Sequence, residues 1–297
     1  MSTALHAPTH VVVATDFSPC SDQALRRADA VAQRLGARLT LLHVVAPLPV
    51  LSAWGDPGGA AWMGLEALQA AGLRALERQR AQHPDLLVPN LGLRCLIGQP
   101  RRDLGGLAAD LGGDLLVLGA HPPAHLGQAL LGSTAQATVH ACPIPLLVCR
   151  RPAAAPWQRL LAATDFSPAA DRAVDLSAAL APDASKRLLH VHGALPEATL
   201  ALVQLDPAAL ARYVDAADAA AAARFKAICD RHPHWLGQFR RGEATDSVWR
   251  EATLHAADLV AVGTRGHGPW LGGLLGSVGQ RLLAKLDADV LLVPPAA

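Results

Sequence analysis

The chain has almost no net charge and no concentrated basic segment. Its 26 Lys and Arg residues offset 25 Asp and Glu residues to a formal net charge of +1, and charged residues make up only 17% of the chain. No run of Lys or Arg is longer than two residues. Nucleic acids and anionic membrane surfaces attract proteins through a strong positive field, which this composition does not supply. We therefore expect no nucleic-acid partner and no membrane association.

Segments that direct a chain into or across a membrane are also missing. The longest apolar-looking run, residues 39–54, is interrupted by His43, Pro47 and Pro49. It is shorter than the roughly 20 residues that a membrane-spanning helix needs. Residues 1–10 contain no basic stretch followed by an apolar region, as a secretory signal would. These features predict a cytoplasmic protein.

Cysteine and histidine occur without the spacings of a disulfide framework or a metal site. The five cysteines are odd in number and form no C-x-x-C pair, which predicts free, mostly buried thiols. The 13 histidines form only loose pairs, of which His190 and His192 lie two apart and would share one face of a strand. His43 and His190 occupy the same position of an internal repeat, which indicates a structural role at a strand's end.

Catalytic and phosphate-binding signatures of the common enzyme classes are absent. There is no G-K pair, so no Walker loop is possible, and Gly266-x-Gly268 lacks the third glycine of a dinucleotide-binding motif. There is also no G-x-S-x-G and no H-E-x-x-H sequence. The chain therefore offers no set of catalytic residues. This favours a protein that acts by binding, with slow turnover at most.

What the chain does contain is a tandem repeat. Apolar residues make up 51% of its 297 residues, enough for two buried cores. The run Val11–Asp16, followed by Phe-Ser-Pro, recurs as Leu160–Asp165, and Asp165 lies 149 positions after Asp16 (165 − 16). Serine then proline is typical of a helix N-cap and first helical position. Each Asp is therefore expected at the carboxyl end of a strand, directly before a helix.

A glycine-rich loop repeats with a different offset. Asp258–Val262 leads into Gly263, Gly266, Gly276 and Ser277, spaced as G-x2-G-x9-G-S. A weaker copy has Gly119, Gly132 and Ser133, each 144 positions earlier (263 − 119). A donor-rich turn at a strand's end, followed by Gly-Ser at the start of a helix, is suited to holding phosphate oxygens.

Strands and helices alternate throughout both halves, which predicts an α/β fold with a doubly wound, five-stranded parallel sheet in each. We assign domains to residues 1–150 and 158–297 with a linker at 151–157. The apolar closing strands of the halves are expected to pair with each other, giving an intramolecular pseudo-dimer, while a homodimer of chains stays open. In such sheets ligands bind where the strand order reverses, which puts the Asp and the glycine loop in one crevice if the first and fourth strands are neighbours. The other expected strands are 39–45, 93–97, 144–149, 187–191, 238–241 and 289–293, and the long helices are at about 59–83 and 206–232.

These motifs together resemble the universal stress protein family, once in each half, as in its tandem members. The shared features are the strand-end Asp with F-S-P, the L-L-H-V strand, D-L-x-V-x-G and G-x2-G-x9-G-[ST]. The resemblance implies a universal stress protein, or adenine nucleotide α-hydrolase-like, fold that binds ATP, ADP or AMP, with Mg²⁺ as a possible companion. It places Asp165 by the ribose, phosphates and metal, and Val191 by the adenine. Gly263, Gly266, Gly276 and Ser277 would hold ribose and phosphates, and the first-half equivalents are Asp16, Val44, Gly119, Gly132 and Ser133.

The first half departs from the family pattern at one position, where Pro122 replaces the second glycine. Proline has a fixed φ near −65° and no N–H, so it neither adopts glycine's left-handed conformations nor donates to a phosphate. We therefore predict an intact nucleotide loop in the second half and a degenerate one in the first. Arg265, inside the intact loop, is a further candidate for pairing with a phosphate.

Three functions remain open on the sequence. The leading one is a stress-response regulatory protein that binds an adenine nucleotide with little or no turnover. An alternative is a weak Mg²⁺-dependent ATPase or self-phosphorylating protein, with Ser277 or Ser167 as acceptor and Asp165 holding the metal. A third is a nucleotide-free scaffold that binds a partner protein or an apolar ligand. A purely structural interpretation also remains open, in which Asp16 and Asp165 only cap helices and the glycine loop is a tight turn.

Overall fold

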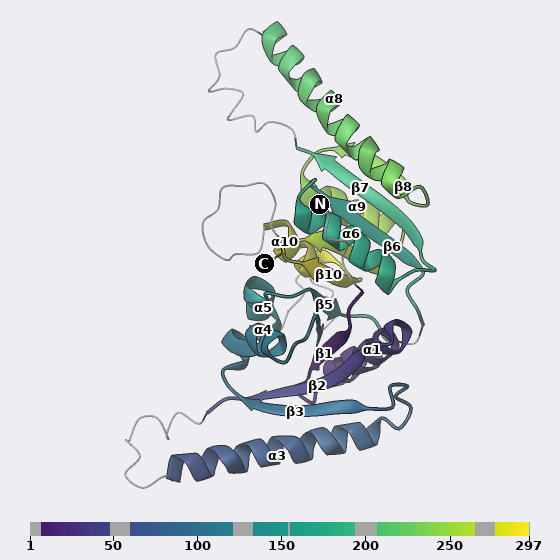
Figure 1. Ribbon diagram of the computed structural model, residues 1–297. Helices are drawn as coiled ribbons and strands as arrows, with labels where there is room; N and C mark the ends of the chain where they lie inside the picture. Colours follow the sequence, from purple (N-terminus) through teal and green to yellow (C-terminus); the bar gives the residue numbers. More distant parts are fainter. Residues whose placement is uncertain are drawn as a thin grey trace.

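The computed structural model describes residues 7–47, 60–120, 133–153, 155–193, 207–264 and 277–296 (Figure 1). Strands and helices alternate along both halves, as the sequence predicts. The first half contains β1 (His10–Ala14), α1 (Pro19–Leu35), β2 (Arg38–Val45), α3 (Ala60–Gln82), β3 (Leu91–Ile97), α4 (Pro100–Asp110), β4 (Leu115–Gly119), α5 (Ser133–Ala141) and β5 (Leu146–Cys149). The second half contains β6 (Arg159–Thr164), α6 (Pro168–Leu180), β7 (Ser185–His192), α8 (Pro207–Arg231), β8 (Leu236–Arg241), α9 (Ala244–Leu254), β9 (Leu259–Gly263), α10 (Ser277–Lys285) and β10 (Asp289–Val293).

All ten strands belong to one sheet, in the order β3-β2-β1-β4-β5-β10-β9-β6-β7-β8. Within each half the strands run parallel, and β1 lies between β2 and β4 just as β6 lies between β7 and β9. The strand order therefore reverses beside β1 and beside β6. The condition set by the sequence, that the first and fourth strands are neighbours, is confirmed in both halves.

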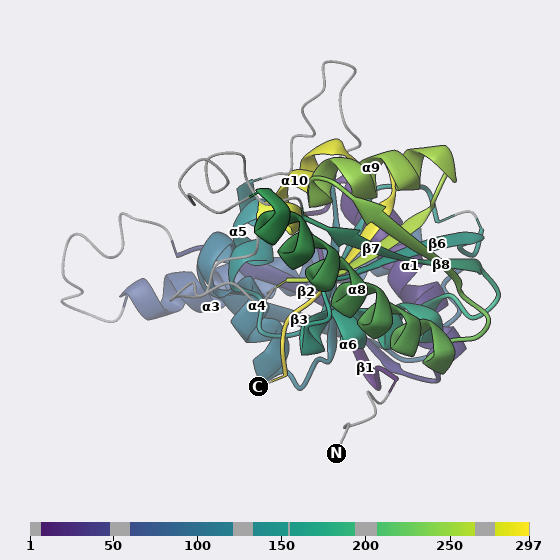
Figure 2. The same cartoon turned by 90° about the horizontal axis from the view of Figure 1, so that it is seen from above.

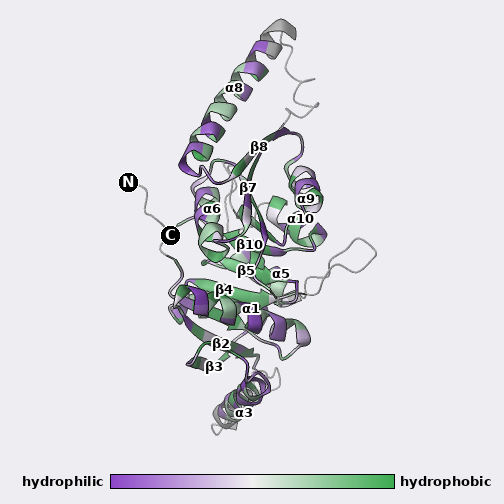
Figure 3. Ribbon diagram, turned by 90° about the vertical axis from the view of Figure 1, so that its right-hand side faces the viewer, coloured by the Kyte–Doolittle hydropathy of each residue, from purple (hydrophilic) through white to green (hydrophobic). Residues whose placement is uncertain are grey.

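The halves join through an antiparallel pair of their closing strands, in which Leu147 of β5 faces Leu291 of β10. Internal pairing of these strands is thus confirmed. Every residue of β5 and β10 is buried, whereas the edge strand β8 is partly exposed. In Figure 3 these central strands form the hydrophobic middle of the molecule. Pairing hides from solvent two apolar edges that would otherwise invite association with other chains.

Two layers of helices cover the sheet, one on each face (Figure 2). Helices α1, α3, α6 and α8 pack on one core cluster, which includes Leu25, Leu76, Leu176 and Phe225. Helices α4, α5, α9 and α10 pack on the other, which includes Leu282. Each cluster contains residues of both halves, so the core on either face of the sheet is continuous across their junction. Among the described residues, no helix combines the length and apolar character needed to cross a membrane.

The sequence boundaries are accurate within about two residues. Strand β10 has the expected bounds, and α3 and α8 each differ from expectation by one residue at either end. Strand β5 begins at Leu146 instead of Ile144, because Pro145 precedes it and lacks the N–H that pairing needs. All five cysteines are free as predicted, but only Cys95 and Cys149 are buried, and the other three are half-buried.

Candidate functional site

The candidate site lies at the carboxyl edge of the second half, where β6 and β9 run side by side. Asp165 is exposed and follows β6 directly. Gly263 is the last residue of β9, and α10 begins at Ser277. In the first half Asp16 follows β1, Gly119 ends β4, and α5 begins at Ser133. The topology therefore brings the predicted Asp and the start of the glycine loop to the same edge of the sheet in each half, where the strand order reverses.

Each strand-end Asp caps the turn that starts the next helix. The backbone N–H of Ser167 donates to Asp165 Oδ1 at 3.0 Å, and Ser18 N–H donates to Asp16 Oδ1 at the same distance. The serines cap α6 and α1 as predicted, because each Oγ accepts a backbone N–H three residues later. Capping is thus a real role of both carboxylates, and it is the same in both halves.

Asp16 is further stabilised in its charged form. Burial alone raises the pKa of the Asp16 carboxyl, but hydrogen bonds from Ser18 and Ser21 outweigh burial and hold the pKa below its usual value. The carboxylate of the first-half turn is therefore anionic at neutral pH.

The residue after each Asp adopts a left-handed backbone conformation that bulky side chains rarely take. Phe166 has φ 65° and Phe17 has φ 64°. Two contacts hold Phe166: its N–H donates to Thr164 Oγ1 at 3.0 Å, and its ring stacks on His190 with centroids 4.0 Å apart. The matching Phe17 ring tilts against His43 at 4.5 Å. The sequence signal for this arrangement is the repeated T-D-F-S, at residues 15–18 and 164–167.

His43 and His190 are structural, as predicted from their equivalent positions. His190 Nδ1 lies 2.8 Å from the carbonyl oxygen of Thr164, and His43 Nδ1 lies 2.9 Å from that of Thr15. Because a carbonyl only accepts, each Nδ1 carries the proton and donates. Burial lowers the pKa of His190, so this ring is neutral at pH 7.

The strand-end glycines bring a helix close to the sheet. A Cβ on Gly263 would lie 2.7 Å from the backbone nitrogen of Ala170, and one on Gly119 would lie 2.2 Å from the carbonyl oxygen of Cys20. Only glycine permits these contacts with α6 and α1. Packing therefore gives a sufficient reason for glycine at both positions, independent of any ligand.

The remaining predicted site residues fall into two groups. Val191 on β7 is half-buried and Val44 on β2 is buried, both on the face covered by α4, α5, α9 and α10. Those outside the described residues are Arg265, Gly266, Gly276, Pro122 and Gly132.

Behind the Asp turn, on the side of the long helices α3 and α8, the halves differ in chemistry. In the first half Thr15 Oγ1 donates to Gln79 Oε1 at 3.0 Å, and Gln79 Nε2 donates to Asp22 Oδ1 at 2.7 Å. In the second half the rings of Phe166, His190, Phe225 and Phe239 pack together instead. The guanidinium of Arg224 lies over the Phe166 ring at 4.7 Å. A polar network and an aromatic cluster thus support the same turn.

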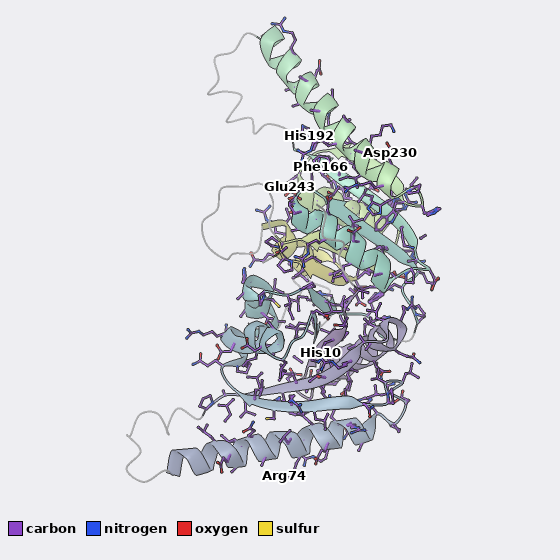
Figure 4. The ribbon with its side chains drawn as sticks, in the orientation of Figure 1. His10, Arg74, Phe166, His192, Asp230 and Glu243 are labelled. Atoms are coloured by element: carbon purple, nitrogen blue, oxygen red, sulfur yellow. The ribbon has the colours of Figure 1, made fainter. Side chains whose placement is uncertain are left out.

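Charged side chains also line the carboxyl edge of the second half. His192 Nε2 lies 3.2 Å from Asp218 Oδ1. Glu243, after β8, accepts the backbone N–H of Asp246 at 2.7 Å as the N-cap of α9, and Arg281 of α10 lies 3.5 Å from it. Figure 4 shows Phe166, His192 and Glu243 on the same side of this half. In the part of the chain that the structure describes, no three His, Cys, Asp or Glu residues are grouped so as to hold a metal ion.

Comparison with known proteins agrees with the repeat and the fold. A universal stress protein of Mycolicibacterium smegmatis is 28% identical over 308 residues, covering 96% of this chain and 97% of that protein. The crystal structure of a universal stress protein from Archaeoglobus fulgidus DSM 4304 shares the fold, with a TM-score of 0.64, 14% identity, and coverage of 96% and 98% of the two chains. A universal stress protein crystallised in complex with cAMP aligns with 37% of this chain and 70% of its own, at 24% identity and a TM-score of 0.26.

The sequence model of the Universal stress protein family matches the chain twice, over residues 8–150 and 156–294. Together these matches cover both repeats, and the fold has the parallel five-stranded arrangement in each. The chain belongs to the Universal stress protein family and is a tandem member of it.

Proposed function

We propose that this protein is a cytoplasmic stress-response regulator that binds ATP, or a related adenine nucleotide, in its second half with little or no turnover. The observation that carries this proposal is the convergence of Asp165, the end of β9 at Gly263 and the start of α10 at Ser277 on one crevice at the switch point of the strand order. Ligands of open parallel sheets bind at this point. Family membership supplies the class of ligand.

Each part of the nucleotide is assigned to a group in this crevice. Asp165 contacts the ribose and phosphates and shares a Mg²⁺ ion with the phosphate oxygens, while the backbone of Val191 meets the adenine. The first turn of α10 has backbone N–H groups without partners in the helix, and these suit phosphate oxygens. Gly263, Gly266, Gly276 and Ser277 hold the ribose and phosphates, and Arg265 pairs with a phosphate.

The first half is proposed to bind nucleotide weakly or not at all. Its equivalent residues Asp16, Val44, Gly119, Gly132 and Ser133 are present, but Pro122 removes one backbone donor and fixes the loop's φ at that position. The backbone N–H contact that Asp16 and Asp165 accept is the same in both turns. The proposed difference in binding therefore originates in the loop and not in the Asp turn.

Little turnover is expected because the sequence contains none of the common catalytic motifs. Phosphoryl transfer to water needs an oriented nucleophile and several cations around the transferring group. Only Arg265 and a metal at Asp165 are available for this in the proposed site. Nucleotide occupancy, rather than hydrolysis, is then the signal that such a regulator transmits.

The test is nucleotide titration of the purified full chain by calorimetry and by thermal unfolding, with ATP-Mg²⁺, ADP, AMP and cAMP. A nucleotide that binds only the folded state should stabilise it by about 2.7 kcal/mol at 100 times its Kd. We expect about one nucleotide per chain. Absence of binding and of stabilisation with all four nucleotides would overturn the proposal.

Matched variants locate the site. Asp165→Ala and Asp16→Ala remove the same capping contact from equivalent turns, so a common loss of stability cancels between them. Of these two variants, Asp165→Ala should abolish nucleotide binding and Asp16→Ala should not. Gly266→Pro, which copies Pro122 of the first half, should also abolish it. Steady phosphate release that disappears in Asp165→Ala would instead favour the weak ATPase.

A further inference from the structure

We infer that the first half supports the nucleotide site of the second half, and that Arg150 is the positioning residue through which it does so. This inference rests on the proposed function. Arg150 follows β5 of the first half, yet its guanidinium reaches the carboxyl-terminal end of α10, the helix whose amino-terminal end is assigned to phosphate. A degenerate half that binds no nucleotide would then still be required for tight binding in the other.

The contacts of Arg150 cap α10. Its guanidinium donates to the carbonyl oxygen of Leu286 at 3.3 Å and to that of Leu283. These carbonyls belong to the last turn of the helix or follow it directly, where no backbone N–H within the helix is available to them. Arg150 is only 6% exposed, so the interaction is shielded from solvent. A cation at this end also interacts favourably with the helix dipole, which adds to the stability of the last turn of α10.

A buried carboxylate fixes the position of Arg150. Asp289, the first residue of β10, is fully buried and accepts the backbone N–H groups of Arg150 at 2.8 Å and Arg151 at 3.0 Å. Its other oxygen accepts Trp157 Nε1 at 2.8 Å and lies 3.4 Å from Arg27 Nε of α1. The segment between the domains is therefore anchored to Asp289, the fourth residue after the end of α10.

Helix α1 completes this cluster from the first half. The guanidinium of Arg27 donates to the carbonyl oxygen of Ala155 at 2.8 Å and lies over the Trp157 ring at 4.6 Å. Arg27 is 4% exposed and Trp157 is 5% exposed. Two side chains of the first half therefore contact the second half: Arg150 at the carboxyl-terminal end of α10, and Arg27 at Asp289, the first residue of β10.

The support has no counterpart in the opposite direction. Strand registers place Cys149 beside Gly119 and Val293 beside Gly263, so the residue equivalent to Arg150 is Pro294. The equivalents of Asp289 and Arg27 are Pro145 and the buried, apolar Leu176. Within the described residues, no side chain donates to the last carbonyls of α5. Only the helix beside the intact loop is capped from the other half, which matches the proposed division of function.

The experiment compares Arg150→Met with Arg172→Met in the full chain. Arg172 also donates from a guanidinium to a carbonyl, that of Pro294 at 2.7 Å, but does not touch α10. In ligand-free protein, hydrogen exchange of the α10 amides should accelerate about tenfold in Arg150→Met, while the α5 amides keep their rate. The ATP-Mg²⁺ Kd should rise by a similar factor of about ten, within the usual range of coupling between sites. Arg172→Met should leave both values unchanged.

Arg150→Lys keeps the positive charge but places it differently. The lysine also lacks the planar guanidinium that donates to two carbonyl oxygens at once. It should recover part of the affinity, and it remains informative if Arg150→Met does not fold. Unchanged α10 exchange in a folded Arg150→Met, or an equal effect in Arg172→Met, would overturn the inference. If the unsubstituted chain binds no nucleotide, the proposed function fails and the nucleotide part of this inference with it. Hydrogen exchange still decides whether Arg150 supports α10.

Discussion

The two halves are alike at the turn that follows their first strand and different at both ends of the helix that follows the glycine loop. In both, the Asp accepts the same N–H, the Phe adopts the same left-handed conformation, and the strand-end glycine lies against the helix that follows the Asp turn, α1 or α6. These contacts serve folding, so each half needs them whether or not it binds a ligand. The repeated Asp and first glycine are therefore weak indicators of function when taken alone.

The differences carry more information about function. The loop before α5 contains Pro122 where the loop before α10 contains Gly266. Arg150 caps the far end of α10, whereas the equivalent residue of the second half is Pro294. Neither residue of each pair is required for folding, because both halves form the same strand order. The comparison can be tested by perturbing what is unique to one half and what is shared.

The largest effect is expected at the unique cluster, from Asp289→Ala. This change leaves Arg27 buried without its carboxylate and removes an acceptor for three N–H groups. Breaking such a buried pair on one side costs about 3–5 kcal/mol of unfolding free energy. Urea denaturation measures the loss. Pro145→Ala at the equivalent position is the control and should cost far less. A loss of under about 1 kcal/mol for Asp289→Ala would show that the cluster does not hold the halves together.

A shared contact is tested next, by Gly119→Ala and Gly263→Ala. Both should destabilise, by about 1–3 kcal/mol, because the added Cβ meets backbone atoms that cannot move aside. The control is Gly106→Ala in α4, where a Cβ meets nothing within 4 Å. That change should stabilise by about 0.5–1 kcal/mol. Equal tolerance of alanine at all three positions in thermal unfolding would contradict the close packing.

Removal of the helix caps should affect the halves almost equally. Ser18→Ala and Ser167→Ala each delete an Oγ that accepts a backbone N–H. The expected cost is about 1 kcal/mol for either variant in urea denaturation. A difference of more than about 1 kcal/mol between them would mean that the two turns are less alike than their geometry indicates.

The smallest effect is the part of the pH dependence of stability that comes from His190, in the aromatic cluster of the second half. Burial lowers the pKa of His190, nearby His192 and Arg224 lower it further, and the Thr164 carbonyl and Asp165 oppose them. The unfolded chain therefore binds a proton before the folded one does, and stability should fall as pH drops below the ordinary value of 6.5. Unfolding free energies at pH 7 and pH 5 should show a smaller decline in His190→Asn. His10, whose pKa is also lowered by burial, accounts for part of the decline that remains. An identical slope in wild type and variant would exclude His190 as its source.

Local signals in the sequence identified most of the fold. Ser-Pro pairs predicted the starts of α1 and α6 because an N-cap acts within three residues of itself. Short apolar runs predicted the strands, and β1 and β10 are buried along their whole length. Asp114 and Asp258 begin the two apolar runs that end at Gly119 and Gly263, and this pattern alone does not indicate what the carboxylates bind. The structure shows that Asp114 accepts the backbone N–H groups of Thr9 and His10, as Asp258 does for the start of β6.

The sequence by itself determined the alternation of strands and helices, the two repeats, the placement of each Asp before a helix and the loss of a glycine at Pro122. Each depends on neighbours within a few residues, so it can be read along the chain. Tertiary structure alone decided that Asp289 pairs with Arg27 and accepts hydrogen bonds from Arg150 and Trp157, and that the His190 ring stacks on Phe166. These contacts join residues that lie up to 262 positions apart (289 − 27). No local periodicity encodes such pairs, because they form only when the assembled sheet has brought distant elements together and removed water from between them.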